Sequence, residues 1–535
     1  MKSIIKITAL AAALMLLGGC YAGAIVTPTP MPESSQLRPQ TSISPQSGGE
    51  ISIPMPEKPY TWHPLFVKES GMSNIFSMIF EPLIAIDSQL LPAVSIANSW
   101  EFDDEGRVIV RLRSGVQFHN SDTLTSGDVV FTFNMVLENP ESIYHSQVSE
   151  YVESVEAVDA NTVRFHPKKA GYAIYYALSV PVIPESVYAA LPQQTDAMPI
   201  GTGGFAVGTY NPGDNTSLEL VRNTYWWKKQ PYIEKIHAVG YRDNAAAIQA
   251  FIDGRLDCVP TDIYTTDIYD SYSGVSCYSY MSNYYDFLAP NFKNDILTDV
   301  NIRRAISYAV DRKGIIANIY INHGISMEYP FAGDCAFNND DIQRCDYSVS
   351  KACSLLEAAG WLPGEDGIRV KNGKRLSFRL LTLRNDDNPV RRDTAAMLRR
   401  QLAEAGMEIQ TVTEDGDALR EDIAQGNFDL LLTGYYFSGS PDVSFALKTG
   451  GSGNVMRYSD SECDAYFARL DAARTRDEYA SVYAQLQQYV AKQLPQIGLI
   501  GFSQTLIHRD RLVPCGINRD LRVYENMDKW YVTQA

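Results

Sequence analysis

The chain has 535 residues, 45% of them hydrophobic, and a formal net charge of −17. A chain of this length exceeds what one hydrophobic core usually supports, so we expect two or three domains. The negative charge argues against nucleic acid as a partner, because nucleic-acid binding depends on a basic surface. Beyond the first twenty residues, no uninterrupted apolar stretch is long enough to span a bilayer.

The N-terminus has the pattern of a secretory signal peptide, residues 1–20. Lys2 and Lys6 precede an uncharged run, residues 7–17, which is too short to cross a membrane and is followed by small residues. The Leu-Gly-Gly-Cys sequence that ends at Cys20 resembles the lipobox of bacterial lipoproteins, which implies that Cys20 is acylated. We therefore expect a protein anchored to the cell membrane on its extracytoplasmic face, extracellular or periplasmic. The alternative is a plain signal peptide with an incidental cysteine.

A flexible tether and a first group of strands follow. Residues 21–49 are rich in Pro, Ser, Thr and Gln and poor in large apolar side chains, which predicts a tether without a core. The turn pair Glu105-Gly106 divides residues 99–113 into two strand-like halves and predicts a hairpin. Residues 162–166 and 217–222 are further short strand candidates.

Helix signals come next along the chain. Residues 245–253 are predicted to form a helix that ends at Gly254. Asp299 is placed to cap a helix over residues 302–310, whose apolar side chains share one face. Near the C-terminus, residues 479–490 carry the apolar face of a longer helix.

The middle of the chain alternates between strand and helix patterns. Asn372-Gly373 is a two-residue hairpin signal. After it the predicted elements are a strand at 376–383, a helix at 389–405, a strand at 408–412, a helix at 418–425 and a strand at 428–432. This order implies a parallel sheet covered by helices, which is an α/β architecture.

Besides Cys20 the chain has seven cysteines, an odd number, so at least one stays unpaired in a monomer. They are Cys258, Cys277, Cys335, Cys345, Cys353, Cys463 and Cys515. In an oxidising compartment, a Cys335–Cys345 or a Cys258–Cys277 bond would close a short loop. Buried inert thiols are the alternative. With no Cys-x-x-Cys pair and only scattered histidines, we predict no metal site.

Motifs for catalysis are missing, so we predict no enzyme, no catalytic residues and no cofactor. The G-x-S-x-G pattern fails at Asn454, and there is neither a P-loop nor an H-E-x-x-H sequence. The Gly-Thr-Gly-Gly run at 201–204 is better explained as a tight turn. The acidic pairs Asp103-Asp104 and Asp386-Asp387 are more typical of solvated surface than of acid–base chemistry.

Several segments, collinear from about residue 50 to the C-terminus, resemble family 5 of the extracellular solute-binding proteins. That family serves ABC importers of peptides, nickel chelates and related solutes. The segments that carry the resemblance are Phe80-Glu-Pro-Leu83, Leu91-Pro-Ala93, Asn98-Ser-Trp-Glu101, Arg111-Leu-Arg-Ser-Gly-Val-Gln-Phe-His119, Leu124-Thr-Ser-Gly-Asp-Val-Val130, Gly201-Thr-Gly203, Asn223-Thr-Tyr-Trp226, Gln249-Ala-Phe-Ile-Asp-Gly254 and Asn301-Ile-Arg-Arg-Ala-Ile-Ser-Tyr-Ala-Val-Asp-Arg312.

The resemblance implies an α/β, two-lobed periplasmic-binding-protein fold of the cluster C type with an extra N-terminal subdomain. The implied domains are lobe I (50–69, 196–289 and 496–535), its subdomain (70–195) and lobe II (290–495). A monomer would capture a small-molecule or peptide solute between the lobes and deliver it to an ABC permease. Most signature residues, such as Trp100, Gly115, His119 and Asp128, are better explained by turns, packing and a helix start.

The resemblance also indicates which residues line the cleft. The expected ligand-binding residues are Trp62, His63, Asn291, Arg384, Asn385, Gly434, Tyr435, Tyr436 and Phe437. The aromatic trio at 435–437 offers surface for stacking, apolar packing or a cation. Alternatively, alternate members of the trio fill the core, because successive strand residues point to opposite faces.

Two cleft positions depart from the family pattern. Peptide binders place an aspartate four residues before the matching proline, where this chain has Phe437. Dipeptide binders place an arginine three residues before an Asn-Pro pair, where this chain has Asn385, with Arg384 one step away. A buried ammonium without a carboxylate partner costs roughly several kcal/mol, so free dipeptides are disfavoured. Longer peptides held through backbone hydrogen bonds remain compatible.

Other functions stay open at this point. One is a nickel-chelate or metallophore receptor, for which only His63 is well placed, although one histidine does not select a metal. A surface hydrolase and a surface sensor on the same scaffold are the remaining alternatives.

Overall fold

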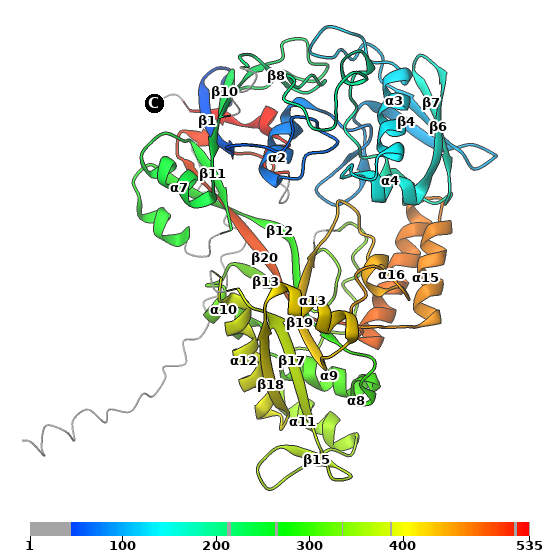
Figure 1. Cartoon of the computed structure of the whole chain (residues 1–535), viewed down its shortest axis with the longest axis vertical. Coiled ribbons are helices and arrows are strands. Elements are labelled where there is room, and N and C mark those ends of the chain that lie inside the picture. The colour runs from blue at the N-terminus through cyan, green and yellow to red at the C-terminus, as the bar shows by residue number, and fades with distance from the viewer. Residues whose placement is uncertain are drawn as a thin grey trace, which may run out of the picture. The chain divides into compact units, whose positions relative to one another are not determined.

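The computed structural model describes residues 44–210, 216–262, 266–333, 335–385, 388–517 and 522–533. The predicted signal peptide, Cys20, most of the predicted tether and Asp386-Asp387 lie outside these ranges. The first sheet has the order β1-β10-β9-β8, and β1 runs parallel to β10 (Figure 1). Its strands are β1 (Glu50–Pro56), β8 (Phe205–Val207), β9 (Ser217–Arg222) and β10 (Lys235–Tyr241).

Strand β1 forms where apolar and other residues alternate. Ile51, Ile53 and Met55 are buried, whereas the residues between them are partly exposed. This period of two places one face of the strand on the core. Helix α2 (Ser70–Ile79) packs against this sheet and buries its own apolar face, including Ile75 and Ile79.

A second, antiparallel sheet has the order β4-β5-β7-β6. The predicted hairpin is confirmed, with Gly106 at a φ of 79° in its turn. The predicted helix start at Asp128 is also confirmed, since this side chain forms a capping box with Thr125. The elements of this region are β2 (Ala85–Ile86), β3 (Pro92–Ala93), β4 (Ala97–Phe102), β5 (Val108–Leu112), α3 (Ser126–Glu138), α4 (His145–Tyr151), β6 (Val152–Asp159), β7 (Thr162–Pro167), α5 (Ile174–Ala177) and α6 (Glu185–Tyr188).

The largest sheet has the order β11-β20-β12-β19-β17-β18, with β13 also paired to β20. Strand β17 lies parallel to both β18 and β19, which confirms the predicted strand–helix–strand–helix–strand unit. The strands and helices of this sheet and its surroundings are β11 (Cys258–Thr261), β12 (Val275–Pro290), β13 (Gly324–Ser326), β17 (Ser377–Leu383), α12 (Val390–Glu404), β18 (Glu408–Glu414), α13 (Gly416–Gln425), β19 (Leu430–Tyr436) and β20 (Ile497–Arg509).

The remaining elements complete the layers around these sheets. They are α7 (Asn244–Ile252), η1 (Thr266–Ser271), α8 (Asp295–Thr298), α9 (Val300–Ala309), α10 (Arg312–Ile319), α11 (Val349–Ala358), β14 (Leu362–Pro363), β15 (Arg369–Lys371), β16 (Lys374–Arg375), α14 (Ser444–Leu447), α15 (Ser461–Ala472), α16 (Arg476–Gln493), β21 (Leu512–Val513), η2 (Met527–Lys529) and β22 (Tyr531–Val532). Asp299 caps α9 through the Asn301 amide, and Asn372-Gly373 joins β15 to β16, both as predicted.

The two longest strands, β12 and β20, pair antiparallel along most of their lengths. We call them the crossing strands. In Figure 1 they run side by side from the neighbourhood of β11 to that of β19, and the pairing of their residues agrees. β12 ends at Pro290 and β20 begins at Ile497. The changes of lobe that the family resemblance implies, at 289–290 and 495–496, stay a prediction.

The seven cysteines of the folded body all remain thiols. The proposed Cys258–Cys277 loop is therefore not closed. In the sheet, Cys258 lies opposite His508 and Cys277 opposite Ile507, on either side of β20, so a whole strand separates them. Burial raises the pKa of the Cys463 thiol to about 12, in keeping with the prediction of buried inert thiols.

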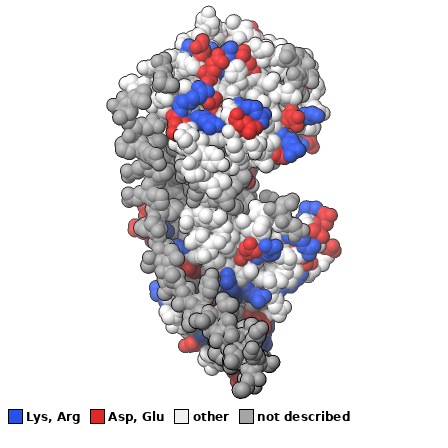
Figure 2. All heavy atoms as spheres, turned by 90° about the vertical axis from the view of Figure 1, so that its left-hand side faces the viewer, with Lys and Arg blue, Asp and Glu red and all other residues white. Residues whose placement is uncertain are grey.

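The described helices include none that is both long enough and apolar enough to cross a bilayer. On the face shown in Figure 2, acidic and basic side chains are interspersed and do not separate by sign.

Candidate solute-binding site

A cavity of about 650 Å³ lies beside the crossing strands. We call it the crossing-strand cavity. Its walls come from the ends of β1, β10 and β11, from the first turns of α2 and α7, and from one side chain each of β12, β19 and β20. Those three side chains are Tyr280, Tyr436 and Gln504. The Tyr280 hydroxyl donates to Gln504 Oε1 at 3.0 Å, which ties the two crossing strands together at the cavity wall.

Tyr436 is the member of the predicted aromatic trio that faces this cavity. It is 57% exposed, and its ring lies edge-on to Tyr284, 4.7 Å away. Tyr435 and Phe437 point to the other face of the strand end, as alternation requires. The Tyr435 hydroxyl donates to Gln496 Oε1 at 3.2 Å, and Phe437 stacks on Tyr285 at 5.8 Å. These two rings therefore belong to the core, as the alternative interpretation of the sequence stated.

Gly434 leaves room for the Asp286 side chain and offers no side chain to a solute. It pairs with Asp286 across β12 and β19, and a Cβ at residue 434 would lie 2.3 Å from Asp286 Oδ1. Asp286 forms a buried ion pair with Arg391 at 2.7 Å. Burial raises the pKa of Asp286, and the guanidinium of Arg391 offsets part of that rise. The pair fixes the part of β12 that lies beside Gly434, two residues from Tyr436.

Trp62 and His63, expected to line the cleft, are enclosed in the core in this structure. Trp62 packs edge-on against Tyr210 at 5.5 Å, and the His63 ring meets Phe66 and Tyr188 edge-on at 4.7 and 4.9 Å. The imidazole Nδ1 accepts the Leu65 amide, while Nε2 has no hydrogen-bond partner. Burial lowers the pKa of His63 to about 4.

The loop that carries these two residues turns inward because it is hydrogen-bonded to the segment 193–195. The Thr61 hydroxyl donates to the Gln193 carbonyl at 2.8 Å, and the Trp62 amide donates to the Thr195 carbonyl at 2.8 Å. The enclosed imidazole is the residue on which the nickel-chelate alternative depended. Within the described ranges, no group of three or more His, Cys, Asp or Glu side chains is placed to hold a metal ion.

Asn291 has a structural role. It lies just after the C-terminal end of β12, away from the cavity. Its amide donates to the carbonyls of Gly426 and Phe428 at 3.0 and 2.8 Å. Along β12, the pairing runs from Tyr284 opposite Tyr436 to Pro290 opposite Leu430. Six residues of strand separate those ends by about 20 Å, so Asn291 lies beyond the opposite end of this pairing from Tyr436, and its role in solute binding stays a prediction.

Arg384 and Asn385 lie on an exposed loop outside the cavity lining. Arg384 donates to the Thr413 carbonyl at 3.2 Å, and Asn385 Oδ1 accepts the Asn388 amide at 3.1 Å. Neither side chain reaches the cavity wall in this structure, so their predicted ligand contacts would require movement of this loop.

Several residues of the cavity wall were missed by the sequence interpretation, among them Tyr280 and Gln504. The charged members of the lining are Lys68, Arg242, Asp243 and Asp262. Asp243 caps α7 through the Ala246 amide and pairs with Arg242 at 2.9 Å. These residues come from segments that are distant in the sequence and become neighbours only through strand pairing. No local motif therefore identifies them as lining residues.

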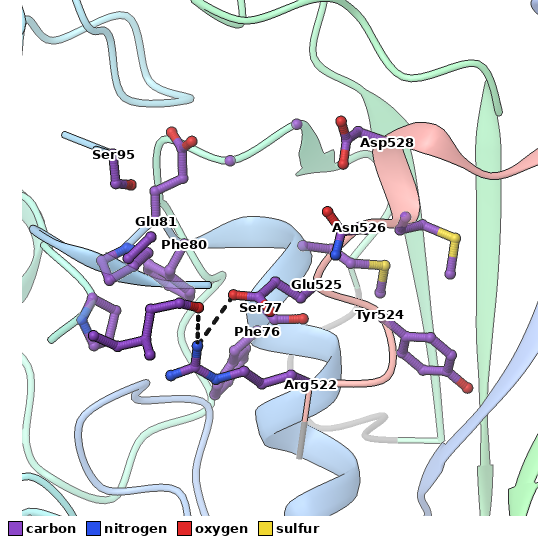
Figure 3. Close-up of a pocket in the computed structure, with 18 of the residues that line it drawn as sticks. Phe76, Ser77, Phe80, Glu81, Ser95, Arg522, Tyr524, Glu525, Asn526 and Asp528 are labelled. Carbon is purple, nitrogen blue, oxygen red and sulfur yellow. Dashed lines mark hydrogen bonds and ion pairs between the residues drawn. The ribbon is translucent and has the colours of Figure 1, made fainter. Parts of the chain in front are cut away.

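A second cavity of about 640 Å³ lies against another part of α2 and the C-terminal segment (Figure 3). Glu81, from the Phe-Glu-Pro-Leu signature, is one of its residues. Its carboxylate meets Lys228 Nζ at 2.8 Å and accepts the indole of Trp227 at 2.8 Å. Arg522 donates to the Ile86 carbonyl and pairs with Glu525, as the dashed lines in Figure 3 show. Glu81 is thus a structural residue that ties the signature to the 227–228 segment.

Known proteins resemble this chain along nearly its whole length. Oligopeptide-binding protein AppA of Bacillus subtilis is 26% identical over 530 residues, covering 94% of this chain and 95% of its own. Heme-binding protein A of Haemophilus influenzae is 24% identical, with coverage of 92% and 94%.

Solved structures share the fold. AppA from Bacillus subtilis in complex with a nonapeptide superposes with a TM-score of 0.65 at 24% identity, covering 92% of this chain and 100% of that one. NikZ from Campylobacter jejuni in complex with Ni(L-His) gives 0.68 at 21% identity, covering 90% and 99%. This confirms the α/β, two-lobed fold predicted from the sequence.

Both relatives are named as binding proteins, and residues 92–456 match the sequence pattern described as bacterial extracellular solute-binding proteins, family 5 Middle. The chain therefore belongs to family 5 of the bacterial extracellular solute-binding proteins.

Proposed function

We propose that this protein is a lipid-anchored extracytoplasmic receptor that captures a peptide-like or related small solute in the crossing-strand cavity and delivers it to an ABC import permease. The observation that supports this most strongly is the position of the cavity against both crossing strands and Tyr436. A solute at this position contacts the crossing strands. In a hinge motion, bending of these strands rotates one lobe relative to the other. Binding of the solute in the cavity therefore favours one conformation of the protein, and the permease recognises that conformation.

The size and chemistry of the cavity suit a solute with both apolar and polar groups. Its volume of about 650 Å³ lies in the usual range for small-ligand sites. Tyr241, Tyr280 and Tyr436 contribute rings with hydroxyl groups, which pack against apolar surface and exchange hydrogen bonds. A peptide backbone with mixed side chains has this combination of groups, and the relative AppA is an oligopeptide-binding protein.

The structure around Phe437 supports a longer peptide over a free dipeptide. The ring is only 6% exposed and stacks on Tyr285, so the position offers neither a carboxylate nor an open surface. A solute held mainly through backbone hydrogen bonds needs no ammonium partner there. The preferred solute is then a peptide of several residues whose terminus extends beyond this position.

The solute can be identified from protein purified under native conditions. Compounds released by unfolding would be separated and weighed by mass spectrometry, then returned to emptied protein in a calorimeter. We expect a peptide-like compound that binds saturably and is recovered unchanged. A heme or a metal chelate would replace the proposed solute class, and a hydrolysed peptide would contradict the receptor role.

The lipid anchor is tested separately. In cells that express the full chain, Cys20→Ser should move the protein from the membrane fraction to the soluble fraction, because it removes the acylated thiol. The matched change Cys515→Ser lies in the folded body and should leave the protein at the membrane. Wild-type protein in the soluble fraction would support the plain signal peptide, and retention of Cys20→Ser at the membrane would contradict anchoring through this thiol.

A further inference from the structure

Two parts of the chain meet at a contact that does not involve the crossing strands. We call residues 85–188, which hold the β4–β7 sheet, the small unit, and residues 291–496 the large unit. In Figure 1 the helices α15 and α16 of the large unit lie directly below α4 of the small unit. Gly171, in the loop after β7, sits at the centre of this contact.

The backbones of the two units touch at Gly171. A Cβ on this residue would lie 2.2 Å from the Asp471 carbonyl oxygen and 3.2 Å from the Ala473 carbonyl oxygen. The next amide, Tyr172 N–H, donates to the Ala473 carbonyl at 2.6 Å. Gly171 does not have a positive φ, so its lack of a side chain is needed for space alone.

Side chains extend the contact on both sides of Gly171. Lys169 pairs with Glu150 of its own unit at 2.7 Å and with Asp471 of the large unit at 3.2 Å. The Tyr172 ring lies 5.4 Å from Tyr479 of α16. A second backbone bond joins the units where the Ala336 amide donates to the Gln89 carbonyl at 2.8 Å.

We propose that this contact is a latch that holds the small unit on the large unit and must break before the crossing-strand cavity opens widely. The reason is geometric: the contact lies away from β12 and β20, so a rotation about those strands separates Gly171 from Asp471. Bending of the strands alone, with the latch intact, is confined to small movements. Its effect on solute release rests on the proposed function, whereas the latch itself does not.

Hydrogen exchange of the full-length protein tests the latch without any solute. The amides of Tyr172 and Ala336 donate across the contact, so they report its opening directly. In Gly171→Ala the new methyl group displaces the Asp471 carbonyl, and both amides should exchange about tenfold faster or more. The matched control is Gly416→Ala, where the added Cβ meets only Arg420 Nη1 at an ordinary 3.5 Å.

A second pair of variants changes only exposed or partly exposed side chains and tests the latch even if Gly171→Ala misfolds. Lys169→Ala removes the ion pair between the units, whereas Lys168→Ala removes a bond to the Ser149 carbonyl within the small unit. Only Lys169→Ala should speed exchange at Tyr172 and Ala336, by about two- to fivefold for a partly exposed pair. Amides inside the β5–β7 and β17–β18 pairs should keep their protection in every variant.

Two results would overturn the proposal. One is unchanged exchange at Tyr172 and Ala336 in Gly171→Ala. The other is an equal rise across both sheets, which would make the contact an inseparable part of one common core. Neither result depends on which solute the protein binds, so failure here leaves the receptor function standing.

Discussion

Gly434 lies directly opposite Asp286 where β19 pairs with β12, and the Asp286 carboxylate occupies the space that a Cβ at residue 434 would need. The carboxylate is held there by Arg391, which approaches from the start of α12 at 2.7 Å. This close approach explains why residue 434, in the loop that was predicted to bind solute, is a glycine. It supports the strand end that presents Tyr436, without itself meeting the cavity.

Gly434→Ala should therefore lower stability through overpacking. The added Cβ would lie 2.3 Å from Asp286 Oδ1 and 2.6 Å from the Tyr285 carbonyl oxygen, so backbone has to move. We expect a loss of about 1–3 kcal/mol in the free energy of unfolding, measured by urea titration. Gly416→Ala, which has room for its methyl group, should change this value by less than about 0.5 kcal/mol. Equal stability of the two variants would contradict the close approach.

The buried imidazole of His63 should make stability depend on pH. In the folded protein its pKa is lowered to about 4 by burial, whereas in the unfolded chain it is about 6.5. Between these values the unfolded state binds the extra proton, so this group favours folding above pH 6.5 and loses that contribution as the pH falls towards 4. The change amounts to about 3 kcal/mol.

The measurement compares wild type with His63→Phe, which fits the aromatic surroundings. Urea titrations at pH 7, 5 and 4 would follow both proteins. The difference in unfolding free energy should shift in favour of His63→Phe as the pH falls. A difference that stays constant with pH would show that the imidazole is accessible to protons in the folded state.

Tyr436→Ala should weaken solute binding without destabilising the fold, because the side chain is 57% exposed and lines the cavity. Loss of one aromatic contact is worth about 1 kcal/mol, or roughly fivefold in affinity. Calorimetry with the solute recovered from native protein would measure this. Tyr436→Phe keeps the ring and serves as the control. An unchanged affinity in Tyr436→Ala would place the solute elsewhere.

Phe437→Asp restores the carboxylate that peptide binders of the family place at this position, so the sequence alone predicts tighter binding of peptide amino termini. The structure predicts a different outcome, because the side chain is enclosed against Tyr285 and Tyr435. A carboxylate without a cation there should lower the free energy of unfolding by about 3–5 kcal/mol. Thermal melting would detect this. A stable variant that binds free peptide amino termini more tightly would show that the position opens to the cavity.

Much of the fold could be predicted from local signals. Asn372-Gly373, the Asp299 cap and the alternation of strand and helix patterns depend on neighbouring residues, and the structure bears them out. The candidate site could be predicted only in part. Because side chains alternate along a strand, Tyr436 was expected to point to the opposite face from Tyr435 and Phe437. Whether Tyr436 faces a cavity depends on the packing of β12 and β20 beside it.

The differences between the expected and the observed positions of these side chains have a common physical cause. Trp62 and Asn291 lie in segments that the family resemblance placed near the cleft, yet their orientation depends on distant carbonyls, at Thr195 and at Gly426. Tyr280 and Gln504 were missed because they become neighbours only through pairing of strands more than two hundred residues apart. Nothing in either local sequence marks such a pair.

Native mass spectrometry of the purified full chain shows whether the protein binds its solute without changing it. We expect a complex with one peptide-like solute per chain, which on unfolding yields protein and solute with unaltered masses. A chain that stays bare after exposure to mixed peptides, or one that returns shortened peptides, would contradict it.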